Sequence, residues 1–301
     1  MSFSSDIKKE LCSLENIQPC CYHAQVYGLV LFAHFNKFNL SITTENKDVF
    51  NLYKESMTNY IGLKPETDTG KVKKLTAEIT DSKQKEKCFD KFGHSLNETS
   101  LRINYANIQN ECCVASFLRG VFLSCGFVSD PNRTYHLELV VPYKRLCNDL
   151  MKIIGELDLE PKYIMRKGNH IVYFKDSESI EDFLAYIGAQ NASLYIMNVK
   201  IEKDIKNKVN RKLNFEYHNM DKTLSASRRQ VDAIKFIKST AGLAILPDYL
   251  KELAVIRLNN PDAPLSELAS MLEDPVSKSG IKHRLDKIVE TADRLKENGD
   301  K

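Results

Sequence analysis

The sequence predicts an α+β N-terminal domain made of two related halves, followed by an all-α C-terminal domain. Three observations support this: an apolar segment that occurs twice, strand and helix periods after each copy, and purely helical spacing near the C-terminus. We place the N-terminal domain at 1–203 (halves about 1–108 and 109–203), a helical linker at 204–228 and the C-terminal domain at 229–301.

The repeated segment reads CCYHAQVYGLVLFAHF at 20–35 and CCVASFLRGVFLSCGF at 112–127, with a constant offset of 92 residues. Each copy is apolar nearly all round, which is typical of a buried helix. Gly28 and Gly120 occupy equivalent positions, although glycine inside a helix costs about 1 kcal/mol relative to alanine. We therefore predict that these two glycines let the helices pack with their backbones in close approach.

Each copy is followed by alternating strand and helix signals. After the first come a strand-like run at 39–43 and a helix-like run at 47–61. After the second come a strand at 135–141, a helix at 145–157, a hairpin of 161–166 with 170–175, and a helix at 177–188. The second half is thus α-β-α-β-β-α in order. Its last helix should have Ser177 or Ser179 as N-cap and Gly188 just past its end.

Two glycine-containing helices, each followed by strands and helices, resemble the LAGLIDADG homing-endonuclease fold. In that motif the third residue packs the helices and the eighth is an acid that binds the catalytic metal. With Gly28 and Gly120 in third place, Ala33 and Cys125 stand in eighth place. A nuclease of this type needs oxygen ligands to hold Mg²⁺ and activate water. We therefore expect a scaffold with no catalytic residue, no bound metal and no enzymatic activity.

Cysteine spacing and composition restrict the other classes. No C-x-x-C motif occurs, which favours buried thiols in a reducing cytoplasm and leaves a redox or metal role as the alternative; the cysteines are Cys12, Cys20, Cys21, Cys88, Cys112, Cys113, Cys125 and Cys147. The longest apolar run, 26–33, is far too short to span a membrane, and no signal peptide is recognisable. The formal net charge of +3 requires any nucleic-acid surface to be local.

The segment 199–238 is rich in basic residues. It contains eleven Lys and Arg residues against five acids, with no proline or glycine, so it predicts one long helix or two. Such a segment is either a solvated helix face or a basic arm that contacts DNA phosphates. The candidate phosphate contacts are Arg211, Lys212, Arg228 and Arg229.

Three short helices are predicted beyond Gly242, at 247–258, 265–272 and from Ser277 onward. Ile281, Leu285 and Ile288 form the apolar stripe of the last one, which Ser277 can cap. Short polar and basic side chains at the N-terminal end of that helix are typical of a helix-turn-helix, here at about 265–297. Asp286 on the same face is a feature against DNA contact. The candidate DNA-binding residues are Ser277, Lys278, Ser279, Lys282, His283, Arg284 and Lys287.

Long runs of the chain resemble the WhiA family over its full length. They include SFSSDIKKEL, ECCVASFLRGVFLSCGFVSDPNRTYHLEL, YIMRKGNHIVYFKD, LPDYLKELAVIRLNNPDAPLSELA and PVSKSGIKHRLDKI. The resemblance implies a degenerate LAGLIDADG domain joined to a C-terminal helix-turn-helix, with 277–289 as recognition helix. It also implies a cytoplasmic, nucleoid-associated bacterial transcription regulator, tied to sporulation or to cell division and chromosome segregation.

The expected partners are double-stranded DNA and other transcription proteins. We expect no cofactor, no membrane and no small-molecule substrate. Two alternatives stay open at this point. One is a homing endonuclease or intron maturase, which the duplicated helices favour and the residues at the acid positions oppose. The other is a protein-binding adaptor whose contact with DNA is incidental, since small helical bundles also serve packing or dimerisation.

Overall fold

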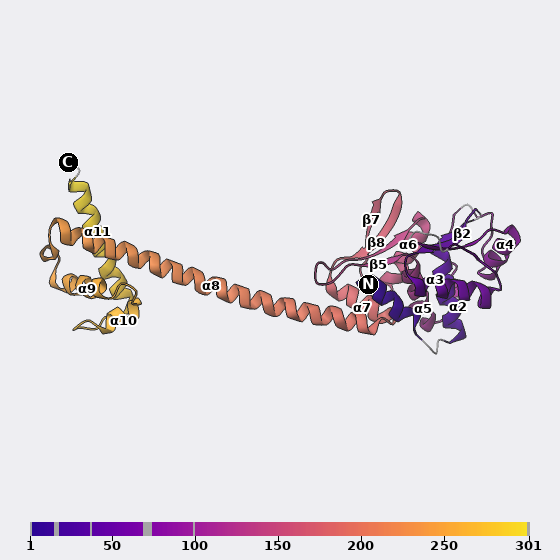
Figure 1. The fold of residues 1–301 in the computed structure, drawn as a ribbon, viewed down its shortest axis with the longest axis horizontal. Helices are drawn as coiled ribbons and strands as arrows, with labels where there is room; N and C mark the ends of the chain where they lie inside the picture. Colours follow the sequence, from indigo (N-terminus) through magenta and orange to yellow (C-terminus); the bar gives the residue numbers. More distant parts are fainter. Residues whose placement is uncertain (1, 15–17, 37, 69–73, 99, 300–301) are drawn as a thin grey trace. The chain divides into compact units, whose positions relative to one another are not determined.

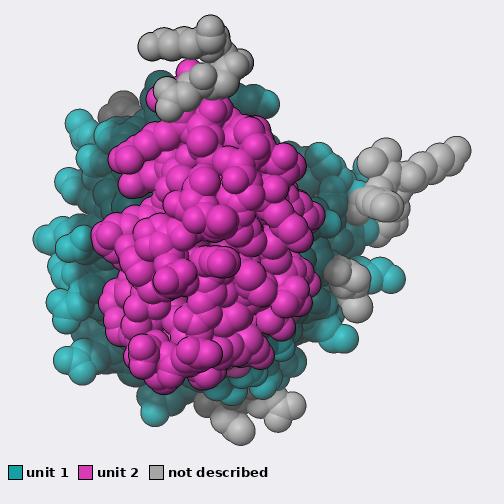
Figure 2. All heavy atoms as spheres, turned by 90° about the vertical axis from the view of Figure 1, so that its left-hand side faces the viewer, with its two compact units in different colours: residues 1–203 teal, residues 204–301 magenta. Residues whose placement is uncertain are grey.

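The computed structural model describes residues 2–14, 18–36, 38–68, 74–98 and 100–299 (Figure 1). The chain forms two compact units, residues 1–203 and residues 204–301, which Figure 2 distinguishes by colour. Each unit has its own hydrophobic core. None of the helices in the described ranges is both long and apolar enough to cross a membrane.

The first half of unit 1 begins with α1 (Phe3–Cys12) and then contains one αββαββα series. Asn46 begins α3 by accepting hydrogen bonds from the backbone N–H of Asp48 (3.0 Å) and Val49 (3.1 Å). The last turn of that helix continues as a π-helical segment, Ser56–Ile61. The elements of the series are α2 (Pro19–Leu31), β1 (His34–Phe35), β2 (Leu40–Thr44), α3 (Lys47–Glu55), β3 (Glu66–Asp68), β4 (Leu75–Ile79) and α4 (Ser82–Lys91).

The second half repeats the same series. Alternating burial along β6, with Leu137, Leu139 and Val141 inside, is that of a strand with one face on the core. Lys167 (φ 51°) and Gly168 (φ 81°) form the two-residue turn between β7 and β8, where both residues must adopt positive φ. The elements are α5 (Glu111–Cys125), β5 (Gly126–Val128), β6 (Leu137–Val141), α6 (Lys144–Gly155), β7 (Lys162–Arg166), β8 (Asn169–Phe174) and α7 (Ser177–Ile187).

Each half forms its own four-stranded antiparallel sheet. The strand orders are β1-β2-β4-β3 and β5-β6-β8-β7, which are equivalent between the halves. The registers are likewise related, with Ile42 opposite Ala77 in the first sheet and Leu139 opposite Val172 in the second. The duplication predicted from the repeat is therefore visible in the topology, and the α+β fold class is confirmed.

Helices α2 and α5 pack along each other at the centre of unit 1. A Cβ atom on Gly28 would lie 2.3 Å from the carbonyl oxygen of Phe117, and one on Gly120 would lie 2.1 Å from that of Gln25. Because the backbone itself fills this space, both helices need glycine at the crossing. The polar side chains of Gln25 and Arg119 are also buried here. Arg119 donates hydrogen bonds to Gln25 Oε1 (3.1 Å) and to the Ile187 carbonyl (2.7 Å).

Three details differ from the sequence-based predictions. The short strand β5 directly follows α5, so the second half has one strand more than predicted. The N-cap of α7 is Asp176, whose carboxylate accepts from Ser179 N (2.7 Å), and not Ser177 or Ser179; Gly188 does follow the helix with φ 98°. Strands β1, β3 and β4 and helix α4 have no counterpart in the prediction. Strand β3 is exposed along its whole length and lacks alternation, whereas Leu75, Ala77 and Ile79 of β4 do alternate with polar residues and were overlooked.

The basic segment belongs to one long helix, α8 (Gln190–Thr240), which reaches from unit 1 into the residues of unit 2. Three further helices follow it: α9 (Asp248–Asn259), α10 (Leu265–Ser270) and α11 (Lys278–Gly299). The end of α8 contributes Ile234 and Ile237 to the core of unit 2. Prolines precede α9 and α10, and Ser277 precedes α11; such residues are typical of helix boundaries.

Candidate nucleic-acid interface

The last helix of unit 2 has one buried face and one polar face. Ile281, Leu285 and Ile288 are fully buried in the core that α8, α9 and α10 complete. This burial fixes the rotation of α11 about its axis. The residues between the stripe positions must then face outward. The DNA-contact residues predicted from the sequence lie on that outward face.

The predicted contact residues lie where an approaching duplex could reach them. All except Arg284 are exposed, and none of Lys278, Lys282, His283 and Lys287 forms a side-chain hydrogen bond or ion pair with another described residue. Cationic side chains without an internal partner can serve phosphate oxygens or guanine edges without first breaking a contact. Asp286 is exposed as well, so this face also carries one acid.

Arg284 has a partner inside the unit. Its guanidinium lies over the ring of Tyr249 on α9, 5.3 Å from the centroid, and the residue is half-buried. A base contact by Arg284 would therefore compete with this cation–π contact. Lys282, one helical turn from Lys278, has no such competitor in the described residues.

Ser277 begins α11 as the sequence predicted. Its hydroxyl accepts from Gly280 N (3.2 Å) and shares a hydrogen bond with the Ser279 hydroxyl (2.9 Å). Each serine keeps hydrogen-bonding capacity after this contact. The helix N-terminus also favours anions, so a phosphate could be held at this end of α11.

The four candidate phosphate contacts lie along α8 and are exposed. Arg229 forms an ion pair with Asp293 of α11, with 3.6 Å between Nη2 and Oδ2. Arg211 donates from Nε to the Asn207 carbonyl of its own helix (3.3 Å). Arg228 and Lys212 make no such contact in the described structure, so they are the freest of the four.

Sequence reasoning missed a buried arginine that organises unit 2. Arg257 is 1% exposed and donates to Gln230 Oε1 (3.0 Å) and to the Ala263 carbonyl (2.6 Å). Burial lowers the pKa of its guanidinium. The arginine thereby ties α8 to the connection between α9 and α10. Its spacing from Leu250, Leu253 and Ala254 was the available signal, since it completes the i, i+3, i+4, i+7 stripe.

In unit 1 the two positions equivalent to the catalytic acids lie just beyond α2 and at the end of α5. Ala33 offers no ligand atom, and the Cys125 thiol donates to the Val121 carbonyl (3.3 Å). Burial raises the pKa of Cys125 to about 12, and the nearby Lys8 ammonium opposes this rise only in part. Burial in turn lowers the pKa of Lys8, so this end of the helix pair holds an amine and a thiol instead of the oxygen ligands that Mg²⁺ requires.

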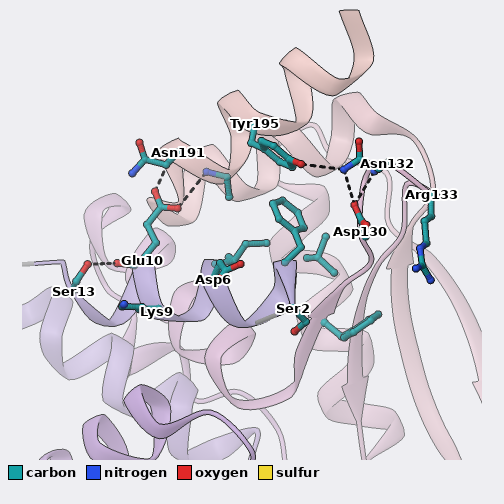
Figure 3. A pocket seen from close by; sticks show the side chains of 15 residues that line it. Ser2, Asp6, Lys9, Glu10, Ser13, Asp130, Asn132, Arg133, Asn191 and Tyr195 are labelled. Carbon is teal, nitrogen blue, oxygen red and sulfur yellow. Dashed lines mark hydrogen bonds between the residues drawn. The ribbon is translucent and has the colours of Figure 1, made fainter. Parts of the chain in front are cut away.

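Unit 1 also has an open cavity between α1, the β5–β6 connection and the start of α8 (Figure 3). Glu10 points from α1 to the first turn of α8, where its carboxylate accepts from the backbone N–H of Asn191 (2.8 Å) and Ala192 (3.2 Å). Tyr195 closes the other side through a hydrogen bond from Asn132 (3.0 Å). These contacts hold the first turns of α8 against the rest of unit 1.

Comparison with known proteins agrees with this arrangement. The family model described as the WhiA LAGLIDADG-like domain matches residues 114–206, and the one described as the WhiA C-terminal HTH domain matches residues 209–292. The crystal structure of full-length WhiA from Thermatoga maritima has the same fold, with a TM-score of 0.58 and 24% identity over 98% of this chain and 99% of that one.

Curated relatives match over nearly their whole length. The chain is 38% identical to the probable cell division protein WhiA of Thermoanaerobacter sp. (strain X514), covering 99% of both chains. It is 36% identical to the protein of the same name from Alkaliphilus metalliredigens, covering 98% of both, and 36% identical to that of Clostridium botulinum (strain Hall), covering 99% of both.

A duplicated LAGLIDADG-like domain joined to a C-terminal helix-turn-helix domain is the class of protein that the fold and these matches define. Within that class, the chain belongs to the WhiA family. The family resemblance and the fold class predicted from the sequence are thereby confirmed.

Proposed function

We propose that this protein is a non-enzymatic regulator that binds double-stranded DNA through the exposed face of α11. The observation that carries the proposal is the set of cationic side chains on this face, with Lys278, Lys282 and Lys287 free of internal partners in the described residues. The buried stripe on the opposite side holds that face outward. Exposed basic side chains of α8, above all Arg228 and Lys212, would add contacts to DNA phosphates, which carry no sequence information.

The relatives are named as probable cell division proteins, which supports a role in cell division. We propose transcriptional control linked to cell division and chromosome segregation or to sporulation, with the protein associated with the nucleoid. Other transcription proteins would then be partners of unit 1. The absence of an acid at Ala33 and Cys125 supports a scaffold over a homing endonuclease.

The decisive experiment measures binding of the full-length protein to duplex fragments from a genomic footprint. Lys282→Ala, if it removes a base contact, should weaken binding to the footprinted duplex by about 1–3 kcal/mol, with little effect on an unrelated duplex. Lys54→Ala, which removes an exposed lysine of unit 1, is the matched control and should bind as the parent does. Equal affinity of the Lys282→Ala and parent proteins for both duplexes would contradict α11 as the reading helix.

The non-enzymatic part is tested with the same material. We expect the purified protein to leave supercoiled plasmid intact in Mg²⁺ or Mn²⁺, since neither acid position supplies the carboxylate oxygen that would hold such an ion. Metal-dependent nicking that co-purifies with the protein, and is lost in a Cys125→Ser variant, would contradict this.

A further inference from the structure

Four cysteine thiols meet at the N-terminal end of the α2–α5 helix pair. The sulfur atoms of Cys20, Cys21, Cys112 and Cys113 all lie within 4.8 Å of one another, and Cys20 Sγ is 3.9 Å from Cys112 Sγ. Among the described residues this is the only group of three or more Cys, His, Asp and Glu side chains that could share a metal ion. It lies at the end of the helix pair opposite to Ala33 and Cys125.

The duplication explains why spacing along the chain did not reveal this cluster. Each helix contributes two adjacent cysteines from its first turn, and the packing of Gly28 and Gly120 sets the two helices in register. Residues 92 positions apart therefore face each other, as Cys20 and Cys112 do. The expectation of no metal ligand rested on spacings within one segment, whereas here the two halves supply one pair each.

The distances suit a single tetrahedral ion. In a tetrathiolate zinc site the zinc–sulfur bonds are about 2.3 Å long, which places the sulfur atoms about 3.8 Å apart. The separation of 3.9 Å between Cys20 and Cys112 is close to this value, and the limit of 4.8 Å for all pairs needs only small rotamer changes. An iron–sulfur cluster contains several metal and sulfide atoms, so its thiolate ligands must stand farther apart than these do.

The surroundings favour an anionic metal complex. The thiols stand at the second and third positions of α2 and α5, where the helix dipole favours negative charge. A zinc ion with four thiolates carries a net charge of −2, so two helix N-termini on one side stabilise it. Cys21 and Cys113 are buried while Cys112 is exposed, which gives the ion a route from solvent.

We propose that Cys20, Cys21, Cys112 and Cys113 bind one zinc ion as a tetrathiolate and thereby tie the two halves of unit 1 together. Binding replaces four S–H bonds with four zinc–sulfur bonds and releases four protons, with no change in oxidation state. The site is structural, because four protein ligands leave no open position for a substrate. It is independent of the DNA-binding proposal, which concerns unit 2.

The test is the metal content of the full-length protein, purified with a reductant and without chelator from cells grown with zinc. Elemental analysis should find one zinc per chain, and a mercurial reagent should release it. Replacement by Co²⁺ should give the absorption of tetrahedral cobalt thiolate. Stripping the metal should lower the melting temperature of unit 1, and added zinc should restore it.

Two variants separate a zinc site from general thiol effects. Cys112→Ser changes an exposed side chain, so the fold should persist while zinc content falls by at least about tenfold under chelator challenge. Cys12→Ser removes a half-buried thiol outside the cluster and should keep its zinc. Protein that contains no zinc and melts identically with and without chelator would overturn the proposal. So would zinc retained in full by Cys20→Ser/Cys112→Ser, or a Cys20–Cys112 disulfide in protein purified under reductant.

Discussion

Gly28 and Gly120 each press against the backbone of the other's helix. A Cβ on Gly28 would meet the Phe117 carbonyl oxygen at 2.3 Å, and a Cβ on Gly120 would meet the Gln25 carbonyl oxygen at 2.1 Å and Leu29 N at 2.7 Å. Phe117 and Gln25 are themselves 92 residues apart, so the contact is repeated on both sides of the pseudo-twofold axis. This contact holds the two halves of unit 1 in the register that also brings the four cysteines together.

Gly120→Ala should therefore force α2 and α5 apart. We expect it to destabilise unit 1 by about 1–3 kcal/mol or more, because the atoms that clash are backbone atoms that cannot rotate away. Thermal melting and hydrogen exchange in the peptides of α2 and α5 measure this. Gly155→Ala is the matched control, since a Cβ there meets nothing within 4 Å and should leave stability equal or slightly higher. Equal melting of the two variants would contradict the tight crossing.

Arg257→Ala should destabilise unit 2. The change leaves a large cavity and removes the donor from Gln230 Oε1 and from the Ala263 carbonyl, so we expect a loss of about 2–5 kcal/mol. Arg257→Lys should recover only part of it, because an ammonium lacks the planar fork that reaches both acceptors. Arg228→Ala, on the exposed surface of α8, should change the free energy of unfolding of unit 2 by no more than about 0.5 kcal/mol. If Arg257→Ala melted like Arg228→Ala, the buried arginine would have no structural role.

Glu10→Ala should loosen the start of α8. The Glu10 carboxylate caps two backbone N–H groups at that helix end, and losing such a cap costs about 0.5–2 kcal/mol. Faster hydrogen exchange at Asn191 and Ala192 is the expected sign. Lys9→Ala, one residue earlier on the same helix, is the control and should leave these two amides unchanged.

Glu181 should make the stability of unit 1 depend on pH. It is 6% exposed, and Oε1 has no hydrogen-bond partner in the described structure. Burial raises the pKa of the carboxyl, the charge of Lys200 opposes this rise in part, and Asp182 and Glu178 add smaller contributions that raise it. Because the folded state prefers the protonated form, stability falls as the pH rises from the ordinary pKa through the raised one. Glu181→Gln should therefore melt higher than the parent at neutral pH.

The difference should shrink when the pH falls below the ordinary glutamate pKa, since the parent is then protonated too. Asp182→Asn, an exposed neighbour on α7, should show no comparable gain at neutral pH. A Glu181→Gln variant that melts below the parent at neutral pH, yet matches it at low pH, would show that the ionised carboxylate stabilises the folded state, which is the opposite of the expected effect.

The elements that could be predicted from the sequence are those that residues close together in the chain determine. The α2–α5 pair, the β7–β8 hairpin and the stripe of Ile281, Leu285 and Ile288 were all readable, because repeats, turn residues and helical spacing report on neighbours in the chain. The β3 strand was not, since all its residues are exposed and pairing with β4 alone defines it. Glu10 and the start of α8 are about 180 residues apart, and no local pattern reports such a contact.

The same distinction between local patterns and tertiary contacts applies to the candidate DNA-binding residues. The exposure of Lys282 and its neighbours could be predicted, because helical periodicity separates buried from exposed positions on α11. The partners of Arg284 and Arg229 could not, because the Tyr249 ring and the Asp293 carboxylate reach them only through the tertiary packing of unit 2. Long charged side chains are read as surface groups, and Arg257 shows how this fails when two acceptors lie inside the core.

Replacing a phosphate contact should change the salt dependence of DNA binding and not its sequence preference. Each lost contact lowers the slope of log K against log salt by about one, because one fewer counterion is released. Arg228→Ala, on an exposed arginine without an internal partner in the described residues, should show this for every duplex tested. Arg229→Ala should show less, because its ion pair with Asp293 already occupies the guanidinium. Titrations of full-length protein at several salt concentrations measure both slopes, with Lys54→Ala as the control; an unchanged slope for Arg228→Ala would place α8 away from the DNA.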